Sequence, residues 1–312
     1  MAPAHLGELA ALTTAVCWTV TGLSFEAASR RVGSLSVNLI RLFIAFGLLC
    51  LFGAITRGKP LPSDADANAW LWLGLSGLIG FSLGDLCLFR AYVLVGARVA
   101  MLMMSLVPPM VALIGKAFLH EDLALRHWVG MAVTVAGVMW VVLEKRRAGG
   151  GLTQEEQLNG AGVRNASGRR LPGVLLALVG AIGQAVGLVM SKKGMGDYNA
   201  FASTQIRILA GLAGFVILFF FIRWWPRVWT AMANRPAMAR TALGATFGPF
   251  LGVSFSLLAV QHTQAGVAAT IMAIVPVLII APAAILFHQR VTARAVLGAC
   301  MAVAGVGILF LG

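Results

Sequence analysis

The chain has 312 residues, of which 59% are hydrophobic and 11% are charged, whereas ordinary soluble domains carry roughly 25% charged residues. This composition excludes a water-soluble fold, because apolar runs of membrane-spanning length follow one another along the chain. The net charge of +13 does not indicate nucleic-acid binding, because the basic residues lie between the apolar runs and form no separate basic domain.

The apolar runs are continuous and rich in Leu, Ala, Val and Gly, so they predict helices rather than the short alternating strands of a membrane barrel. We therefore expect an all-α integral membrane protein with about ten transmembrane helices. The first five spans are expected near residues 7–28, 34–56, 69–92, 97–119 and 127–143. The second five are expected near residues 172–193, 200–222, 241–261, 265–287 and 295–311.

The two sets of spans are separated by a polar, glycine-rich segment without hydrophobic periodicity, at residues 148–170. This composition predicts a flexible polar linker. We therefore divide the chain into a first five-helix unit at 1–147, the linker at 148–170 and a second five-helix unit at 171–312.

The second unit repeats the first. Arg41 aligns with Arg207 at an offset of 166 residues, and Pro108 with Pro276 at an offset of 168. His120 and His288 match at the same offset as the prolines. A repeat with five helices must enter the membrane from the opposite side the second time, so the sequence predicts two inverted repeats, as in many secondary transporters.

The repeated positions resemble the EamA-type members of the drug/metabolite transporter superfamily. The residues that carry the resemblance are Trp18, the run from Arg41 to Ala45, Pro108, Glu121, Gly130 and Gly137 in the first unit, and Arg207, Pro276, Gly298 and Gly305 in the second. The Glu121 position departs from the family pattern in the second copy, where it is Gln289. The resemblance implies ten helices in two EamA repeats and small-molecule transport, often export, without naming the cargo.

Charged residues inside the spans are candidates for function, because a cation at mid-helix costs roughly 2.5–3.5 kcal/mol on insertion scales. Arg41 and Arg207 are interpreted either as structural residues that cap helix carbonyls or as anion-binding residues. Asp85 is the acid that lies clearly within a span. It can pair with Arg41 or Arg90, or act as a protonatable coupling group or cation site.

We predict a substrate cavity near the midplane, where the two halves meet. Pro108 and Pro276 should bend the fourth and ninth spans there, because proline removes a helical hydrogen bond. Trp18 and Gln184 are repeat equivalents near the middle of their spans. The residues expected to line the cavity are Trp18, Asp85, Ser105, Pro108, Gln184 and Pro276. The alternative is that Gln184 only bonds a neighbouring helix and Trp18 only packs.

The favoured function is a secondary transporter that moves a small metabolite or drug-like solute by alternating access, as an exporter. A membrane-embedded enzyme is disfavoured, because the sequence shows no nucleophile with its base, no phosphate loop and no metal cluster. A non-transporting membrane interaction protein is the third hypothesis. No cofactor and no metal are expected. The expected partners are a small-molecule substrate and the lipid bilayer; a coupling proton and a homodimer are left open.

The basic residues between the spans predict the orientation of the chain. One side of the membrane would carry 15 Lys and Arg residues and the other side 5. The positive-inside rule places the richer side, which holds the 148–170 linker, in the cytoplasm. We therefore expect a multi-pass inner-membrane protein with both termini outside the cytoplasm.

Overall fold

The computed structural model describes residues 5–95, 100, 103–144, 170–280, 282 and 292–310, and every regular element in this part of the chain is helical. The first unit contains α1 (Leu6–Val32), α2 (Ser34–Arg57), α3 (Ala67–Gly77), the π-helical segment η1 (Leu78–Gly84), α4 (Asp85–Val95), α6 (Val107–Leu119) and α7 (Leu125–Glu144). The second contains α9 (Arg170–Met195), α10 (Ala200–Phe221), α11 (Trp225–Ala233), α12 (Arg235–Ala245), the π-helical segment η2 (Thr246–Gly252), α13 (Val253–His262), α14 (Ala265–Met272), α15 (Val275–Leu278) and α17 (Ala293–Phe310).

The helices confirm the expected all-α membrane fold. Eight helical stretches in the described residues are long and apolar enough to cross a bilayer. Two shorter apolar helices, Val107–Leu119 and Ala265–Leu278, take the places of the expected fourth and ninth spans. The linker expected at 148–170 lies outside the described residues, except that Arg170 begins α9. The sequence did not predict α11, which lies between two spans.

Polar side chains cap the starts of three helices. The Asp66 side chain accepts a hydrogen bond from the Ala69 backbone at the start of α3, and Asn199 and Asn234 do the same for α10 and α12. Such caps satisfy backbone donors that the first helical turn leaves free. Gly33, with φ of 84°, is the single residue that reverses the chain between α1 and α2.

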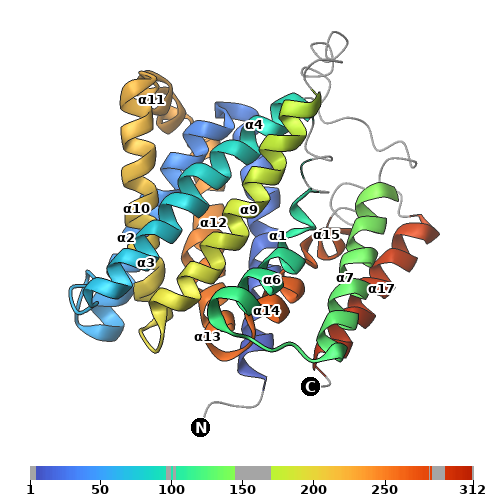
Figure 1. Ribbon diagram of the computed structural model, residues 1–312. Helices are drawn as coiled ribbons and strands as arrows, with labels where there is room; N and C mark the ends of the chain where they lie inside the picture. Colours follow the sequence, from blue (N-terminus) through green and yellow to red (C-terminus); the bar gives the residue numbers. More distant parts are fainter. Residues whose placement is uncertain are drawn as a thin grey trace.

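Equivalent helices of the two units run in opposite directions. In Figure 1, α1 starts at the edge that carries the N-terminus, whereas α9 starts at the opposite edge. These two helices are the first of their repeats. The arrangement is therefore that of inverted repeats, in which equivalent helices run antiparallel.

The repeats interlock through their first helices. α1 packs on α12, η2 and α13 of the second repeat, and α9 packs on α3, η1 and α4 of the first. The Thr21 hydroxyl donates to the Gly244 carbonyl over 3.4 Å, and the Ser76 hydroxyl donates to the Gly187 carbonyl over 2.6 Å. These two bonds join repeat-equivalent positions, so each third span is held by the first helix of the other half.

The fifth helices of the two repeats, α7 and α17, pair with each other at one side of the molecule (Figure 1). Their glycines bring the backbones together: a Cβ at Gly137 would lie 2.5 Å from the Ala302 nitrogen, and a Cβ at Gly305 would lie 2.5 Å from the Thr134 nitrogen. Small residues at such positions allow close helix packing in a bilayer.

Candidate functional site

The third span of each repeat contains a π-helical segment at the same repeat position. η1 covers Leu78–Gly84 and η2 covers Thr246–Gly252, an offset of 168 residues. π-Helical turns are rare and are often found at functional sites. Sequence reasoning missed both segments. The available signal was the glycine pairs at 80 and 84 and at 248 and 252, with Pro249 inside η2.

Asp85 is the first residue after η1, and only 9% of it is exposed. Its Oδ2 atom forms an ion pair with the Arg41 guanidinium on α2. Its Oδ1 atom accepts a hydrogen bond of 2.9 Å from Gln184 Nε2 on α9. Gln184 Nε2 also donates to the Gly80 carbonyl over 3.2 Å. Three spans from both repeats therefore meet at one carboxylate.

This network selects one of the partners that the sequence allowed for Asp85. Arg41 is that partner, whereas Arg90 is exposed. Gln184 lies against the last residue of the π-helical segment, since a Cβ at Gly84 would be in ordinary van der Waals contact with Gln184 Nε2, at 3.5 Å.

Arg207 is the repeat equivalent of Arg41 but has a different environment. It is 5% exposed, and its guanidinium lies over the Phe81 ring, 5.1 Å from the ring centroid. Within the described residues it forms no ion pair and no side-chain hydrogen bond, and its Nε is buried without a partner. Val253 stands where the repeat would place an acid equivalent to Asp85. Asp85 lies near enough to attract Arg207 but forms no ion pair with it, so Arg207 is a buried cation without a direct ionic partner among the described residues.

Trp18 of α1 contacts η2 of the second repeat, and its repeat equivalent, Gln184 of α9, contacts η1 of the first repeat. A Cβ at Gly252, the last residue of η2, would lie 2.7 Å from the Trp18 indole nitrogen. Gly252 and Gly84 are repeat equivalents, so each π-helical segment has a side chain from the opposite repeat against its last glycine. Trp18 makes this contact with an indole ring, and Gln184 with an amide.

The two prolines interrupt their helices, as the sequence predicted for the fourth and ninth spans. α6 begins at Val107, directly before Pro108, after a turn that contains the buried Ser105. α14 ends at Met272 and α15 begins at Val275, directly before Pro276. Neither proline belongs to the Arg41–Asp85–Gln184 network. They mark breaks in the fourth spans of the two repeats, and α6 and α14 pack on each other.

A second polar cluster ties the repeats together near the end of α9. The Glu121 carboxylate, in the loop after α6, forms an ion pair of 2.6 Å with Lys192 of α9. Its other oxygen accepts a hydrogen bond of 2.9 Å from the Ala265 backbone at the start of α14. Lys192 also donates to the Thr263 carbonyl over 2.6 Å. We call Glu121, Lys192, Thr263 and Ala265 the latch. Sequence reasoning had used Lys192 only to predict the orientation.

The fold and this arrangement define a class: a multi-pass membrane transporter built from two inverted repeats. The sequence model of the EamA-like transporter family matches residues 5–143 and 171–311. The chain therefore belongs to the EamA-like transporter family.

Two curated relatives and one solved structure are similar to this chain. An uncharacterised transporter from the cobO 3′ region of a Sinorhizobium species is 34% identical over 131 residues, which are 41% of this chain and 91% of that protein. A probable 4-amino-4-deoxy-L-arabinose-phosphoundecaprenol flippase subunit ArnE of Pseudomonas fluorescens is 33% identical over 112 residues, which are 33% of this chain and 95% of that protein. A crystal structure at 18% identity covers 97% of this chain and 95% of its own, with a TM-score of 0.72, and so shares the fold.

Proposed function

We propose that this protein is a secondary transporter that exports a small metabolite or drug-like solute across the inner membrane by alternating access. The observation that carries the proposal is the group of Arg41, Asp85, Gln184 and Arg207, of which Asp85 and Arg207 are buried and the other two are partly buried. Charged side chains are costly at membrane depth and commonly mark substrate or ion pathways. Transporters built from inverted repeats bind their substrates where the repeats meet.

The charges of this group favour a cargo with an anionic part, such as a carboxylate or a phosphate. Two arginines stand against one aspartate, and that aspartate forms its ion pair with Arg41 and not with Arg207. A guanidinium can bind either kind of anion through two parallel hydrogen bonds. The indole of Trp18 offers an apolar plane with one donor for the rest of the cargo. Asp85 is the group we propose for a coupling proton, taken up when its bond to Arg41 opens.

The latch supports a model in which one face of the transporter closes between the repeats. Glu121 belongs to the first repeat, and Lys192 and Ala265 belong to the second. Opening this face would separate these groups, whereas the glycine-lined pair of α7 and α17 would stay together. The repeat equivalents of Glu121 and Lys192 are Gln289 and Glu26, so the same ion pair cannot form on the opposite face.

We also propose that both termini face away from the cytoplasm. The excess of Lys and Arg on the side of the 148–170 linker supports this orientation. A green-fluorescent-protein fusion at the C-terminus should stay dark, and an alkaline phosphatase fusion should be active. A bright fluorescent fusion with an inactive phosphatase fusion would reverse the orientation.

The proposed function is tested by growth and efflux assays in cells that lack or overproduce the protein. A panel of amphiphilic compounds with a carboxylate, a phosphate or a cationic group is compared at equal membrane abundance. We expect overproduction to lower the accumulation of anionic compounds, and Arg207→Gln to abolish this effect. The control is Arg126→Gln, at an exposed arginine near the start of α7. Selective export of cationic compounds, unaffected by Arg207→Gln, would contradict the proposed cargo.

A lipid-linked phosphate is a second candidate cargo, favoured by the relative whose name is that of a flippase subunit for a phosphoundecaprenol-linked sugar. It has the same anionic chemistry at Arg207. The two candidates differ in where the cargo starts. A flippase would move a fluorescent polyprenyl phosphate between leaflets of a proteoliposome, whereas a solute exporter would leave that probe in place and still lower the content of a soluble anion.

A further inference from the structure

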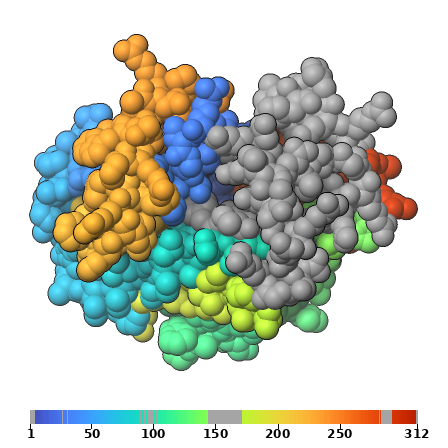
Figure 2. All heavy atoms as spheres, turned by 90° about the horizontal axis from the view of Figure 1, so that it is seen from above, coloured from blue at the N-terminus to red at the C-terminus, as the bar shows by residue number. Residues whose placement is uncertain are grey.

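α11 lies at the surface of the membrane. The span formed by α10 ends at Phe221 and the next span begins at Arg235, so the short helix Trp225–Ala233 between them remains at one membrane face. Its buried residues, Val228 and Ala231, pack into a cluster with residues of α2 and α10. Trp229 on its other side is 63% exposed. Figure 2 looks onto this face, where the orange atoms of the α10–α11 region lie at the outside of the molecule.

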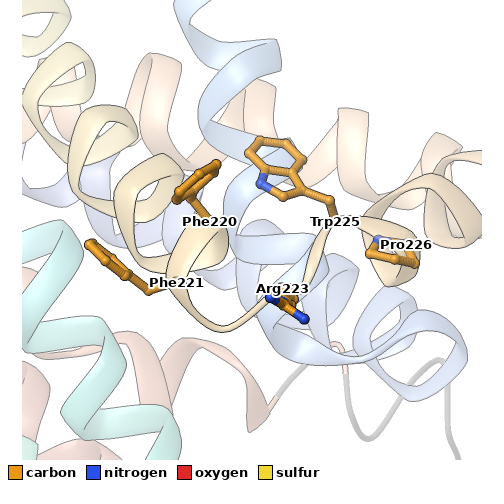
Figure 3. A pocket seen from close by; sticks show the side chains of 5 residues that line it. All are labelled: Phe220, Phe221, Arg223, Trp225 and Pro226. Atoms are coloured by element: carbon orange, nitrogen blue, oxygen red, sulfur yellow. The ribbon is translucent and has the colours of Figure 1, made fainter.

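A pocket opens where α10 passes into α11. It has a volume of about 440 Å³ and is lined by Phe220, Phe221, Arg223, Trp225 and Pro226. Figure 3 shows the two phenylalanines at the end of α10, Arg223 in the connecting turn and Trp225 at the start of α11. Arg223 has a left-handed backbone conformation, with φ of 52°, which residues other than glycine adopt uncommonly. The turn therefore places Arg223 in the lining of the same pocket as Phe220, Phe221 and Trp225.

Two exposed arginines of the α10–α11 region lie in or near this pocket. Arg223 and Arg227 are exposed and form no ion pair with a described residue, and Arg227 stacks over Trp224 at 3.9 Å from the ring centroid. The chain contains no Asp or Glu after Asp197. The second repeat therefore supplies no carboxylate beyond that residue to neutralise these arginines, and an external anion has no competitor from α10, α11 or α12.

We propose that this pocket binds the headgroup of an anionic phospholipid. The phosphate would lie between Arg223 and Arg227, and the acyl chains would run along Phe220 and Phe221, which are 73% and 78% exposed. The position of the pocket at the end of a span fits a lipid headgroup, because tryptophans and arginines at the end of a span lie at the level of lipid headgroups. Basic groups beside a span attract anionic lipids. A soluble anion would use the arginines but not the two exposed phenylalanines, and this favours a lipid.

A lipid in this pocket would lie next to a contact between the two repeats. The Trp224 indole donates to the Ser36 hydroxyl of α2 over 3.3 Å, so the turn that carries Arg223 is fastened to the first repeat. Bound lipid should therefore stabilise the folded protein, since a ligand that binds only the folded state raises its stability. This inference does not depend on the proposed cargo or on the buried Arg207.

The proposal is tested on the purified full chain by native mass spectrometry and thermal unfolding, with phosphatidylglycerol or phosphatidylcholine added to the detergent. We expect preferential binding of phosphatidylglycerol and a higher unfolding temperature with that lipid. Arg223→Gln should weaken phosphatidylglycerol binding by about fivefold, as expected for one basic group near an anionic surface. The double variant with Arg227→Gln should weaken it further. Arg126→Gln, at an exposed arginine of another span, should leave it unchanged.

Further experiments distinguish a bound lipid from other ligands of the pocket. Phe220→Ala with Phe221→Ala should lower phosphatidylglycerol binding, because the acyl chains lose their contact surface. Inorganic phosphate at millimolar concentration should not displace the lipid or raise the unfolding temperature. Equal binding of the two lipids, equal loss in Arg126→Gln, or stabilisation by phosphate alone would overturn the proposal. All variants change exposed side chains, and size-exclusion chromatography checks that they remain folded.

Discussion

The two π-helical segments, η1 and η2, have the same length and the same repeat position, but the chemistry beside them differs. Asp85 follows η1, and Gln184 from the other repeat reaches it through a hydrogen bond. Val253 follows η2, and Trp18 from the other repeat packs against its last glycine. Equivalent backbones thus carry a charged network in one half and an apolar contact in the other.

The comparison of η1 and η2 shows which features both repeats of this chain share and which they do not. Backbone features that need glycine or proline recur in both halves, because close helix approach and helix breaks depend on them. The charged side chains do not recur in pairs: Arg41 forms an ion pair with Asp85, whereas the Arg207 guanidinium lies over the Phe81 ring and forms no ion pair with a described residue. If the cargo binds at these charges, as we propose, their asymmetry between the two repeats would give it one preferred orientation.

The largest effect should come from Asp85→Asn. This substitution removes the carboxylate charge that is paired with the partly buried Arg41 and that also attracts the buried Arg207. We expect transport to fall by at least about tenfold, because a hydrogen bond to a charged group is worth about 1.5–3 kcal/mol. Efflux is measured at equal membrane abundance. The matched control is Val253→Ala at the equivalent position, and an equal transport loss there would break the comparison.

Next in size is the paired substitution of Gln184 and Trp18 by Ala. Both should reduce transport while the protein stays folded, but for different reasons. Gln184→Ala removes the amide that bonds Asp85 and should alter the pH profile of transport. Trp18→Ala removes apolar contact and should raise the substrate concentration for half-maximal rate without changing that profile. Identical profiles in the two variants would show that the two positions have no separate chemistry.

Pro108→Ala and Pro276→Ala should have smaller and similar effects, because both prolines stand at equivalent breaks. Alanine permits a continuous helix, which would straighten the fourth span of the repeat concerned. We expect reduced transport with normal amounts of protein in the membrane. Unchanged transport in both variants would mean that the breaks serve only packing.

The sequence predicted the architecture better than the site, for physical reasons. Span lengths and the repeat of Arg41 and Pro108 depend on local hydrophobicity and on position in the chain, and both are visible in the residues. The partner of Asp85 depends on how α2 and α9 pack on the third span, which a single sequence does not show. π-Helical turns and α11 also escaped prediction, since glycine pairs and a tryptophan-rich loop have several structural meanings. The linker at 148–170 lies outside the described residues.

The pair of α7 and α17 is the region where the two halves should respond alike. A Cβ at Gly137 or at Gly305 would meet backbone of the partner helix at 2.5 Å. Each alanine substitution should lower the free energy of unfolding by about 1–3 kcal/mol, as overpacking usually does. Gly307→Ala, where a Cβ would meet nothing within 4 Å, is the control. Thermal unfolding in detergent measures the difference, and a strongly unequal response would show that this pair is not symmetric.

The smallest expected effect concerns a surface contact that joins the first repeat to the second. Asp64, in the loop between α2 and α3, accepts a hydrogen bond of 2.8 Å from the Tyr198 hydroxyl and forms an ion pair with Arg57. These bonds, first from Tyr198 and then from Arg57, lower the pKa of the Asp64 carboxyl to about 2. A lowered aspartate pKa stabilises the fold above the ordinary value near 3.8, and this contribution is lost as the pH falls toward 2.

The unfolding temperatures of the wild-type protein and Asp64→Asn should therefore differ by a small and constant amount between pH 5 and 8, and the difference should shrink below about pH 4. The exposed position of the contact keeps the difference small, since water screens surface ion pairs. Transport between pH 5 and 8 should be the same in both proteins, so a pH dependence of transport in that range would come from another group. A difference in unfolding temperature that appears only above pH 5 would show that Asp64 ionises at a higher pH and is not held by Tyr198 and Arg57.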